Sequence, residues 1–159
     1  MIPTLLIEAV ATEVEAAVKD YKLSAENQDD KKVTVYRQHI PNDAFEDDSY
    51  YPLAIVSYQD STDAENGSTA TIGITFGVYG EDKNAWRDLL SIMERTRQRL
   101  LIYRKLDDRF RLILPSKFET IENQPYPFWF GYATLAYTIA QPTEELAGDW
   151  QAIMEEDNA

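Results

Sequence analysis

The chain has 159 residues, of which 44% are hydrophobic and 12% aromatic, enough for one domain with a sizeable core and too few for two ordinary domains. It has no cysteine and a single histidine, His39, which excludes disulfides, thiolate nucleophiles, cysteine-based zinc sites and paired catalytic histidines within one chain. Its 28 acidic and 15 basic residues give a net charge of −13, which disfavours binding to nucleic-acid phosphates over most of the surface.

The start of the chain carries no recognisable targeting segment. No apolar run approaches the roughly 18 residues that a membrane span needs. Residues 1–8 lack the basic region of a secretion signal, and Glu8 falls where such a signal is purely apolar. We therefore expect a soluble protein that is made in the cytoplasm and has no membrane partner.

The first half of the chain predicts one helix followed by strands. Apolar residues at steps of three and four predict a helix over about residues 4–23. A polar loop at 24–32 leads to an alternating segment, 33–40, which predicts a strand that ends at Pro41. The acidic stretch that follows, 42–51, is expected to be a mobile loop or an interaction arm.

A hairpin is predicted next. Alternating residues predict a strand over 52–58 and, most clearly of all, another over 70–79. The polar connection between them, 59–68, contains Asn66-Gly67 as its turn signal. Together these segments predict an antiparallel hairpin with one strongly apolar face.

After Gly80 the apolar period changes from two to 3.6, which predicts a helix that runs to about Tyr103. Acidic residues near its start and arginines near its end suit the helix dipole. The remaining segments are a short strand over 110–114, an ambiguous stretch over 116–122, a turn at Pro125 and Pro127, and a long strand over 128–140.

These elements predict a single α+β domain over residues 1–141. We expect a mostly antiparallel sheet of four to five strands packed against two main helices, in the order α-β-β-β-α-β-β. Residues 142–159 hold six acidic residues and no basic one, with apolar residues at loosely helical spacing. They predict an acidic tail or short helix that orders on binding.

No catalytic, cofactor-binding or metal-binding residue is predicted. His39 has no evident partner nucleophile and is expected to lie at a strand edge. Gly73 and Gly77 lie within a strand, whereas a phosphate-binding loop places its glycines where a helix opens. A close backbone approach, by a helix or a neighbouring subunit, is the favoured interpretation. The acidic runs at 43–48 and 60–65 lack the spacing of a calcium loop and predict a solvated face or a docking surface.

Charge is distributed unevenly along the chain. Residues 83–117 hold ten basic and four acidic residues, a net charge of +6, while the other five basic and 24 acidic residues give −19. Arg95, Arg97 and Arg99 are spaced by two and fan around the predicted helix, so they do not form one tight patch. We expect them to line a broad basic edge together with Arg104, Arg109 and Arg111. Two interpretations remain open for this edge, intrachain salt bridges or contact with an acidic surface of a neighbouring copy.

Candidate interface residues follow from these patterns. The aromatic run around Trp129 exceeds what one face of a core absorbs, so part of it is expected at an interface, where aromatic residues are enriched. Trp150 in the acidic tail is a second aromatic candidate. The expected interface residues are Arg95, Arg97, Arg99, Arg104, Asp43, Glu46, Asp47, Asp48, Trp129 and Trp150.

Several segments resemble a known protein family. Residues 52–56 (PLAIV), 71–80 (TIGITFGVYG), 86–101 (WRDLLSIMERTRQRLL) and 129–138 (WFGYATLAYT) are similar to segments of the tail-terminator and tail-completion proteins of long-tailed bacteriophages. The likeness spans about residues 50–140 and the preceding helix. It consists of apolar strand and helix patterns, without a catalytic signature, and it covers neither 42–51 nor the tail.

The resemblance implies a virion structural protein and no enzyme. Its copies would close into a ring, typically a hexamer, at the head-proximal end of the tail. Expected partners are the tail tube protein and a head-completion or connector protein, with DNA passing through the lumen. The alternatives are a head–tail connector or minor tail protein of similar fold and, from another class, a small acidic enzyme or ligand-binding domain.

Overall fold

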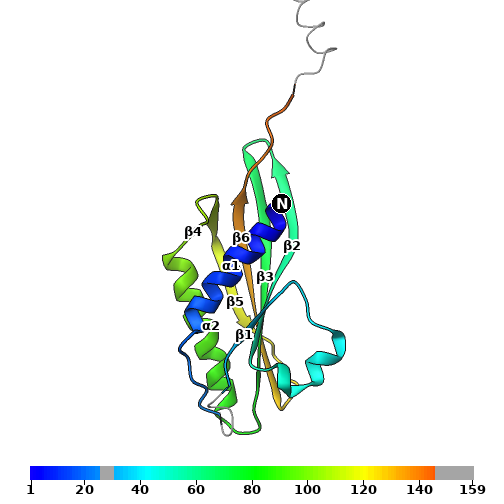
Figure 1. Ribbon diagram of the computed structural model, residues 1–159, viewed down its shortest axis with the longest axis vertical. Helices are drawn as coiled ribbons and strands as arrows, with labels where there is room; N and C mark the ends of the chain where they lie inside the picture. The colour runs from blue at the N-terminus through cyan, green and yellow to red at the C-terminus, as the bar shows by residue number, and fades with distance from the viewer. Residues whose placement is uncertain (26–30, 146–159) are drawn as a thin grey trace, which may run out of the picture.

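The computed structural model describes residues 1–25 and 31–145. They form two helices, two short 3-10 turns and six strands (Figure 1). In chain order the elements are α1 (Ile2–Val18), β1 (Thr34–Arg37), η1 (Asn42–Glu46), η2 (Asp48–Tyr50), β2 (Leu53–Ala64), β3 (Gly67–Tyr79), α2 (Ala85–Ile102), β4 (Lys105–Leu106), β5 (Phe110–Thr120) and β6 (Phe128–Ile139).

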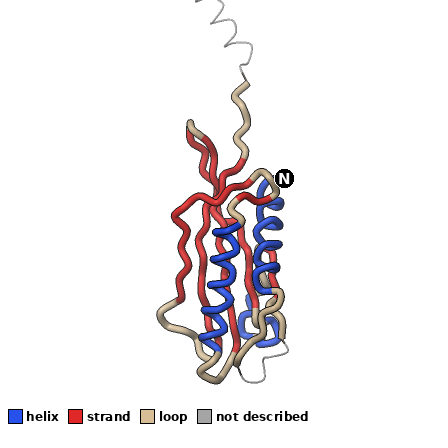
Figure 2. The backbone as a smooth tube through the Cα atoms, turned by 90° about the vertical axis from the view of Figure 1, so that its left-hand side faces the viewer, coloured by secondary structure: helices blue, strands red, loops and turns tan. Residues whose placement is uncertain are grey.

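All six strands belong to one mixed sheet with the order β1-β2-β3-β6-β5-β4. β1 pairs in parallel with β2, and every other neighbouring pair is antiparallel. Both helices pack on the same face of this sheet and run along its strands (Figures 1 and 2). The predicted α+β class is confirmed.

The strand count and order differ from the prediction. The sheet has six strands where four to five were expected, because the two-residue strand β4 precedes β5. The polar segment 59–68 was predicted as a connection, but β2 and β3 pair from Leu53 with Gly77 as far as Ala64 with Gly67. The main-chain ladder holds these residues extended although their side chains carry no apolar alternation.

β5 is also longer than the predicted strand. It continues through the ambiguous stretch, because Lys117 to Thr120 pair with the middle of β6. The register shifts between Ile113 and Lys117, and this irregularity accommodates Pro115, which has no N–H to donate to a ladder.

The main core lies between the sheet and the helices. α1 buries Leu6, Val10, Val14 and Val18, which recur every four residues on one side of the helix. α2 buries a matching stripe that includes Leu89, and both stripes pack on alternate residues of the strands. No helix in the described part of the chain is long and apolar enough to cross a membrane.

A second, smaller core lies on the other sheet face. Alternation along β2 turns Leu53 and Ile55 away from the helices, where Ala44 of η1 and the buried Tyr51 cover them. Phe130 of β6 packs against this cluster. The segment 42–50, called the acidic arm below, is thereby fixed to the sheet by its own apolar residues.

Candidate interaction surfaces

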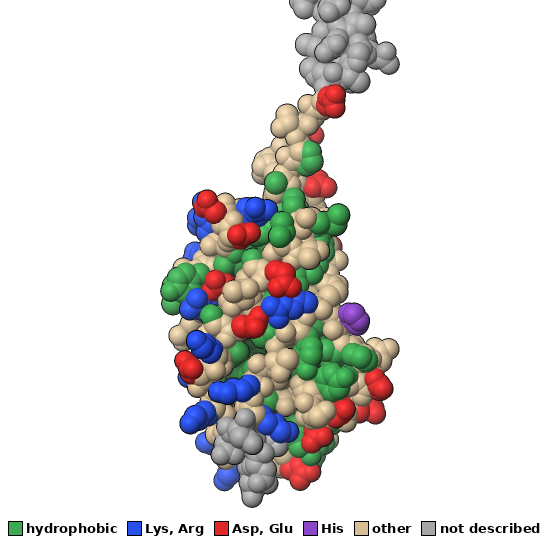
Figure 3. Space-filling model, viewed as in Figure 1, with side chains coloured by type: hydrophobic (Ala, Val, Ile, Leu, Met, Phe, Trp, Pro, Cys, Tyr) green, Lys and Arg blue, Asp and Glu red, His purple; other side chains and the backbone are tan. Residues whose placement is uncertain are grey.

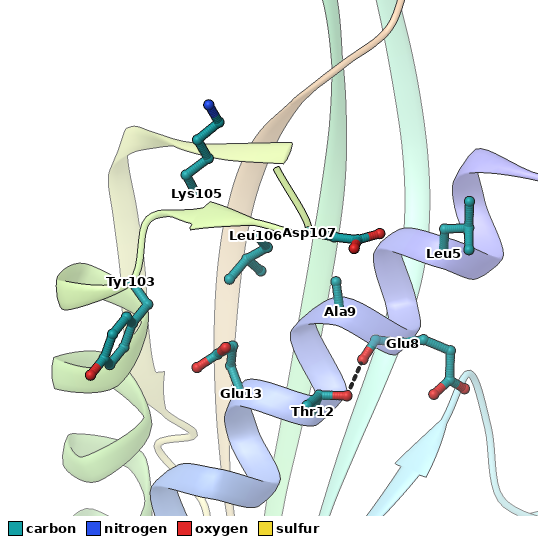
Figure 4. A pocket seen from close by; sticks show the side chains of 9 residues that line it. All are labelled: Leu5, Glu8, Ala9, Thr12, Glu13, Tyr103, Lys105, Leu106 and Asp107. Atoms are coloured by element: carbon teal, nitrogen blue, oxygen red, sulfur yellow. Dashed lines mark hydrogen bonds between the residues drawn. The ribbon is translucent and has the colours of Figure 1, made fainter. Parts of the chain in front are cut away.

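A shallow hollow of about 390 Å³ lies between α1 and residues 103–107, the segment after α2 that contains β4 (Figure 4). Its lining is Leu5, Glu8, Ala9, Thr12, Glu13, Tyr103, Lys105, Leu106 and Asp107. The Thr12 hydroxyl donates to the main-chain oxygen of Glu8 at 2.8 Å, as expected for a threonine on an exposed helix turn.

The carboxylates of this hollow do not form a catalytic pair. Those of Glu8 and Glu13 point to opposite sides (Figure 4). Glu8 pairs with Arg37 at 3.2 Å, and Glu13 pairs with Arg99 at 2.7 Å. Each carboxylate is therefore held by an arginine instead of sharing a proton or a water with the other, as general acid–base work requires.

His39 is exposed to solvent, and the strand glycines Gly73 and Gly77 pack against side chains of the same chain. The main-chain N–H of His39 donates to the Arg37 carbonyl at 2.9 Å. A side chain at Gly73 would collide with Tyr132 and Gln59, and one at Gly77 would collide with Tyr51. The groups that approach these glycines are side chains of the same chain, and not the backbone of a helix or of a neighbouring subunit that the sequence predicted. In the part of the chain that the structure describes, no group of three or more His, Cys, Asp or Glu side chains is placed to hold a metal ion.

The acidic arm is a rigid projection. The Tyr51 hydroxyl donates to the Phe45 carbonyl at 2.8 Å, and the Tyr50 ring lies 6.0 Å from that of Tyr36. Asp47 caps the second turn, because its carboxylate accepts from the N–H and the hydroxyl of Ser49. These hydrogen bonds lower the pKa of Asp47.

The arm presents its charges outward. Asp43, Glu46, Asp47 and Asp48 are all exposed, and none forms an ion pair in the described structure. Glu81 extends this surface, since both Glu81 and Asp48 act on the hydroxyl of Tyr79 and raise its pKa. The first of the two acidic runs that the sequence assigned to a docking surface therefore lies on the arm, whereas Asp60 and Asp63 of the second run lie in β2.

The four predicted interface arginines have different surroundings. Arg97 pairs with Glu94 at 2.9 Å, and Arg99 pairs with Glu13 while its guanidinium covers the Tyr103 ring. Arg104 donates to the Leu101 carbonyl at the end of α2. Arg95 has no acidic partner in the described residues, and its guanidinium lies 4.9 Å from the centre of the Tyr21 ring.

A basic surface surrounds Arg95, and part of it comes from elsewhere in the sequence. Arg87 lies about two turns before Arg95 on α2, and Tyr21 brings the segment after α1 against the same helix. In the described structure none of the surface's members forms an ion pair with an acidic side chain. We define the basic surface as the five exposed cations Lys19, Lys22, Lys32, Arg87 and Arg95. Lys19 and Lys32 line one hollow beside Glu15, and Arg95 lines another beside Glu94.

Asp88 fixes the base of this surface. It is fully buried, and its carboxylate accepts from the Tyr21 hydroxyl at 2.8 Å, from the N–H and hydroxyl of Ser24, and from the Ala25 N–H at 2.9 Å. The segment after α1 is thus tied to the first turn of α2. The sequence signal was an acidic residue beside Leu89 and Ile92 on the apolar side of the predicted helix, where a charge is otherwise costly.

Sequence reasoning missed Lys19, Lys22 and Asp88. The two lysines lie far from the basic window at 83–117, and only the fold brings them beside α2. Asp88 was counted among the acidic residues of that window, although its charge is turned inward.

Of the two predicted aromatic candidates, the structure describes Trp129. Trp129 is partly buried, packs against the main core, and donates from Nε1 to the Gly80 carbonyl at 3.0 Å. Its ring meets that of Tyr126 edge to face at 6.1 Å. Trp150 lies outside the described residues, as does most of the predicted acidic tail.

The two charged surfaces occupy opposite sides of the molecule. Basic side chains gather at the lower left of Figure 3, over α2 and the end of α1, and acidic ones gather at the lower right, over the arm. They lie at a similar level along the long axis.

Comparison with known proteins assigns neither a family nor a function to this chain. The chain matches no protein-family model and no curated protein.

Proposed function

We propose that this chain is a structural subunit of a bacteriophage or prophage virion, of the tail-terminator kind. In this function a ring of copies caps the tail tube at its head-proximal end and joins it to the head. The partners are other copies of the chain, the tube protein and a head-completion or connector protein.

The observation that carries the proposal is the separation of unpaired opposite charges onto two sides of one subunit. A ring built head to tail needs two different and complementary surfaces on each copy. The acidic arm and the basic surface are such a pair, and among the described residues neither forms an ion pair.

The overall charge suits a passage for DNA. The chain carries −13, and most of its acidic residues lie outside the segment 83–117. A lumen lined by such copies repels phosphates, so DNA slides through it without sticking. The described hollows offer no arrangement of side chains that favours catalysis over this structural function.

The proposal is tested by the mass and shape of the assembled protein. Multi-angle light scattering over a range of concentrations is expected to show a species that is a small multiple of the 18.3 kDa chain. Negative-stain electron microscopy of that species is expected to show closed rings with a central hole. A mass that remains that of one chain at every concentration, with no ring in the images, would contradict the proposal and favour a monomeric ligand-binding domain.

A further inference from the structure

The acidic arm and the basic surface fit each other across a boundary between copies. We propose that the arm of one copy binds the basic surface of the next, and that this repeated contact closes the ring. The inference rests on the proposed function and specifies the contact by which its subunits join.

Among the described residues, the charges on both surfaces have no ion-pair partner. Within a copy, Arg97 and Arg99 are already committed to Glu94 and Glu13, so they add little net attraction. In the part of the chain that the structure describes, Arg87 and Arg95 form no ion pair, and their guanidinium groups lie over aromatic rings, of Trp86 at 5.1 Å and of Tyr21 at 4.9 Å. Their guanidinium groups keep their hydrogen-bond donors for carboxylates of a neighbour.

Both surfaces are ordered before they meet. The arm is held by its small core and by the Tyr51 to Phe45 hydrogen bond, and the basic surface is held by the four bonds to Asp88. Preorganised surfaces lose less conformational entropy on association, so a few charge-assisted contacts suffice.

The positions of the surfaces favour a ring over a two-fold dimer. A two-fold contact through the arm alone would place carboxylates against carboxylates, and one through the basic surface would place cations together. Since the two surfaces lie at a similar level on opposite sides (Figure 3), joining them sets copies side by side with their long axes roughly aligned.

Zero-length carbodiimide crosslinking tests the contact directly, because the reagent joins a carboxylate to an amine that touches it. Isotopically labelled and unlabelled chains are mixed, allowed to exchange, crosslinked and digested. The expected products are peptides of mixed isotope composition that join residues 42–50 to Lys19 or Lys22. Mixed peptides that join other segments, with none from the arm, would overturn the inference.

Charge reversal supplies a second test that does not depend on the crosslinking reaction. One variant carries Asp43→Lys, Glu46→Lys and Asp48→Lys, and the other carries Lys22→Glu, Arg87→Glu and Arg95→Glu. All six residues are exposed and have no ion pair in the described structure. Each variant alone is expected to associate at least about a hundredfold more weakly, since like charges then face each other.

An equimolar mixture of the two variants is expected to recover the assembly. The reversed arm of one then meets the reversed basic surface of the other, and each remaining contact is also between opposite charges. Asp60→Lys with Glu65→Lys, at the exposed end of the β2–β3 hairpin, is the matched control and is expected to associate like the unchanged chain.

The outcomes separate this inference from the proposed function. Rings that persist in both reversed variants would overturn the arm contact and leave the ring function standing. An unchanged chain that never assembles would overturn both. Failure of the mixture to assemble, with both variants showing the circular dichroism and unfolding midpoint of the unchanged chain, would also overturn the contact.

Discussion

Asp88 holds its place by hydrogen bonds alone. Its carboxylate is fully buried without an ion pair, and four donors from Tyr21, Ser24 and Ala25 satisfy it. Position in the first turn of α2 adds the favourable field of the helix N-terminus. A buried carboxylate with this number of donors organises the two main-chain N–H groups that no strand or helix otherwise pairs.

Asp88→Ala is expected to lower the free energy of unfolding by about 3 kcal/mol, because it leaves several buried donors without an acceptor. Urea denaturation measures this loss. Asp20→Ala, an exposed aspartate with no ion pair in the described structure, is the control and should change stability by less than about 0.5 kcal/mol. A similar, small effect of both substitutions would show that the segment after α1 is not held by Asp88.

Two buried tyrosines differ in what their hydroxyl groups contact. The Tyr137 hydroxyl is buried with no hydrogen-bond partner among the described residues, and burial together with the charge of Glu13 raises its pKa. Tyr137→Phe is therefore expected to stabilise the fold by about 1 kcal/mol. Tyr51→Phe is expected to destabilise it by about 1 kcal/mol, since it removes the bond to the Phe45 carbonyl. Thermal unfolding of the pair distinguishes these opposite signs, and a loss of stability in both would contradict the assignment.

For single residues, the sequence predicted where charged side chains lie on an element but not which partners they contact. It placed arginines on α2, but it could not separate Arg97, which is paired within the helix, from Arg95, which is not. The distinction depends on which acidic residue comes within reach, and Glu13 reaches Arg99 only after α1 and α2 pack together.

On α2 the Glu94–Arg97 pair makes helix stability depend on acid pH. Hydrogen bonds from Arg97 and Gln98 lower the pKa of Glu94 from its ordinary 4.5 to about 2. The folded pKa is below the unfolded one, so the pair stabilises the fold fully above about pH 4.5 and loses this effect as the pH falls towards 2.

Glu94→Gln is expected to cost only about 0.5 kcal/mol at neutral pH, because the pair is half exposed and solvent screens it. The difference between the variant and the unchanged chain should shrink as the pH falls from about 4.5 towards 2, because Glu94 becomes protonated over this range. Urea unfolding at neutral pH and in acid measures it. A difference that persists undiminished in acid would mean that the hydrogen bonds, and not the charge of Glu94, stabilise the helix.

Helices and strands were predictable from the sequence where apolar residues recur at the spacing of a helix or a strand. The helices and the inner part of the β2–β3 hairpin bury regular stripes, and these were predicted. The outer ends of the hairpin and the second half of β5 were missed, because pairing with distant strands sets them. The parallel pairing of β1 was missed for the same reason, since nothing in residues 34–37 specifies the direction of its neighbour.

For the whole molecule, the separation of basic from acidic residues along the sequence becomes a separation between two sides of the molecule. The residues that form the basic side are not the same set that the sequence predicted. Lys19 and Lys22 join the basic surface through the Tyr21–Asp88 contact, which no local pattern predicts. This separation of charge also creates opposing forces between copies. Their like net charges of −13 repel, while the proposed arm contact attracts.

These forces respond differently to salt, and association is therefore expected to peak at an intermediate ionic strength. The screening length is about 30 Å at 0.01 M, so the net charges of neighbouring copies repel each other across the whole subunit. At about 0.1 M it is about 10 Å, which suppresses this repulsion but leaves ion pairs at about 4 Å attractive. Near 1 M it is about 3 Å, and the contact itself weakens.

Light-scattering mass across this salt range measures the peak. The variant with Asp43→Asn, Glu46→Gln and Asp48→Asn keeps the shape of the arm and removes most of its charge. We expect this variant to associate far more weakly than the unchanged chain. Its remaining association should not fall between about 0.1 M and 1 M salt. An association that instead rises steadily to about 1 M would indicate a contact driven by apolar burial, which salt does not screen. The acidic arm would then have no part in joining the copies.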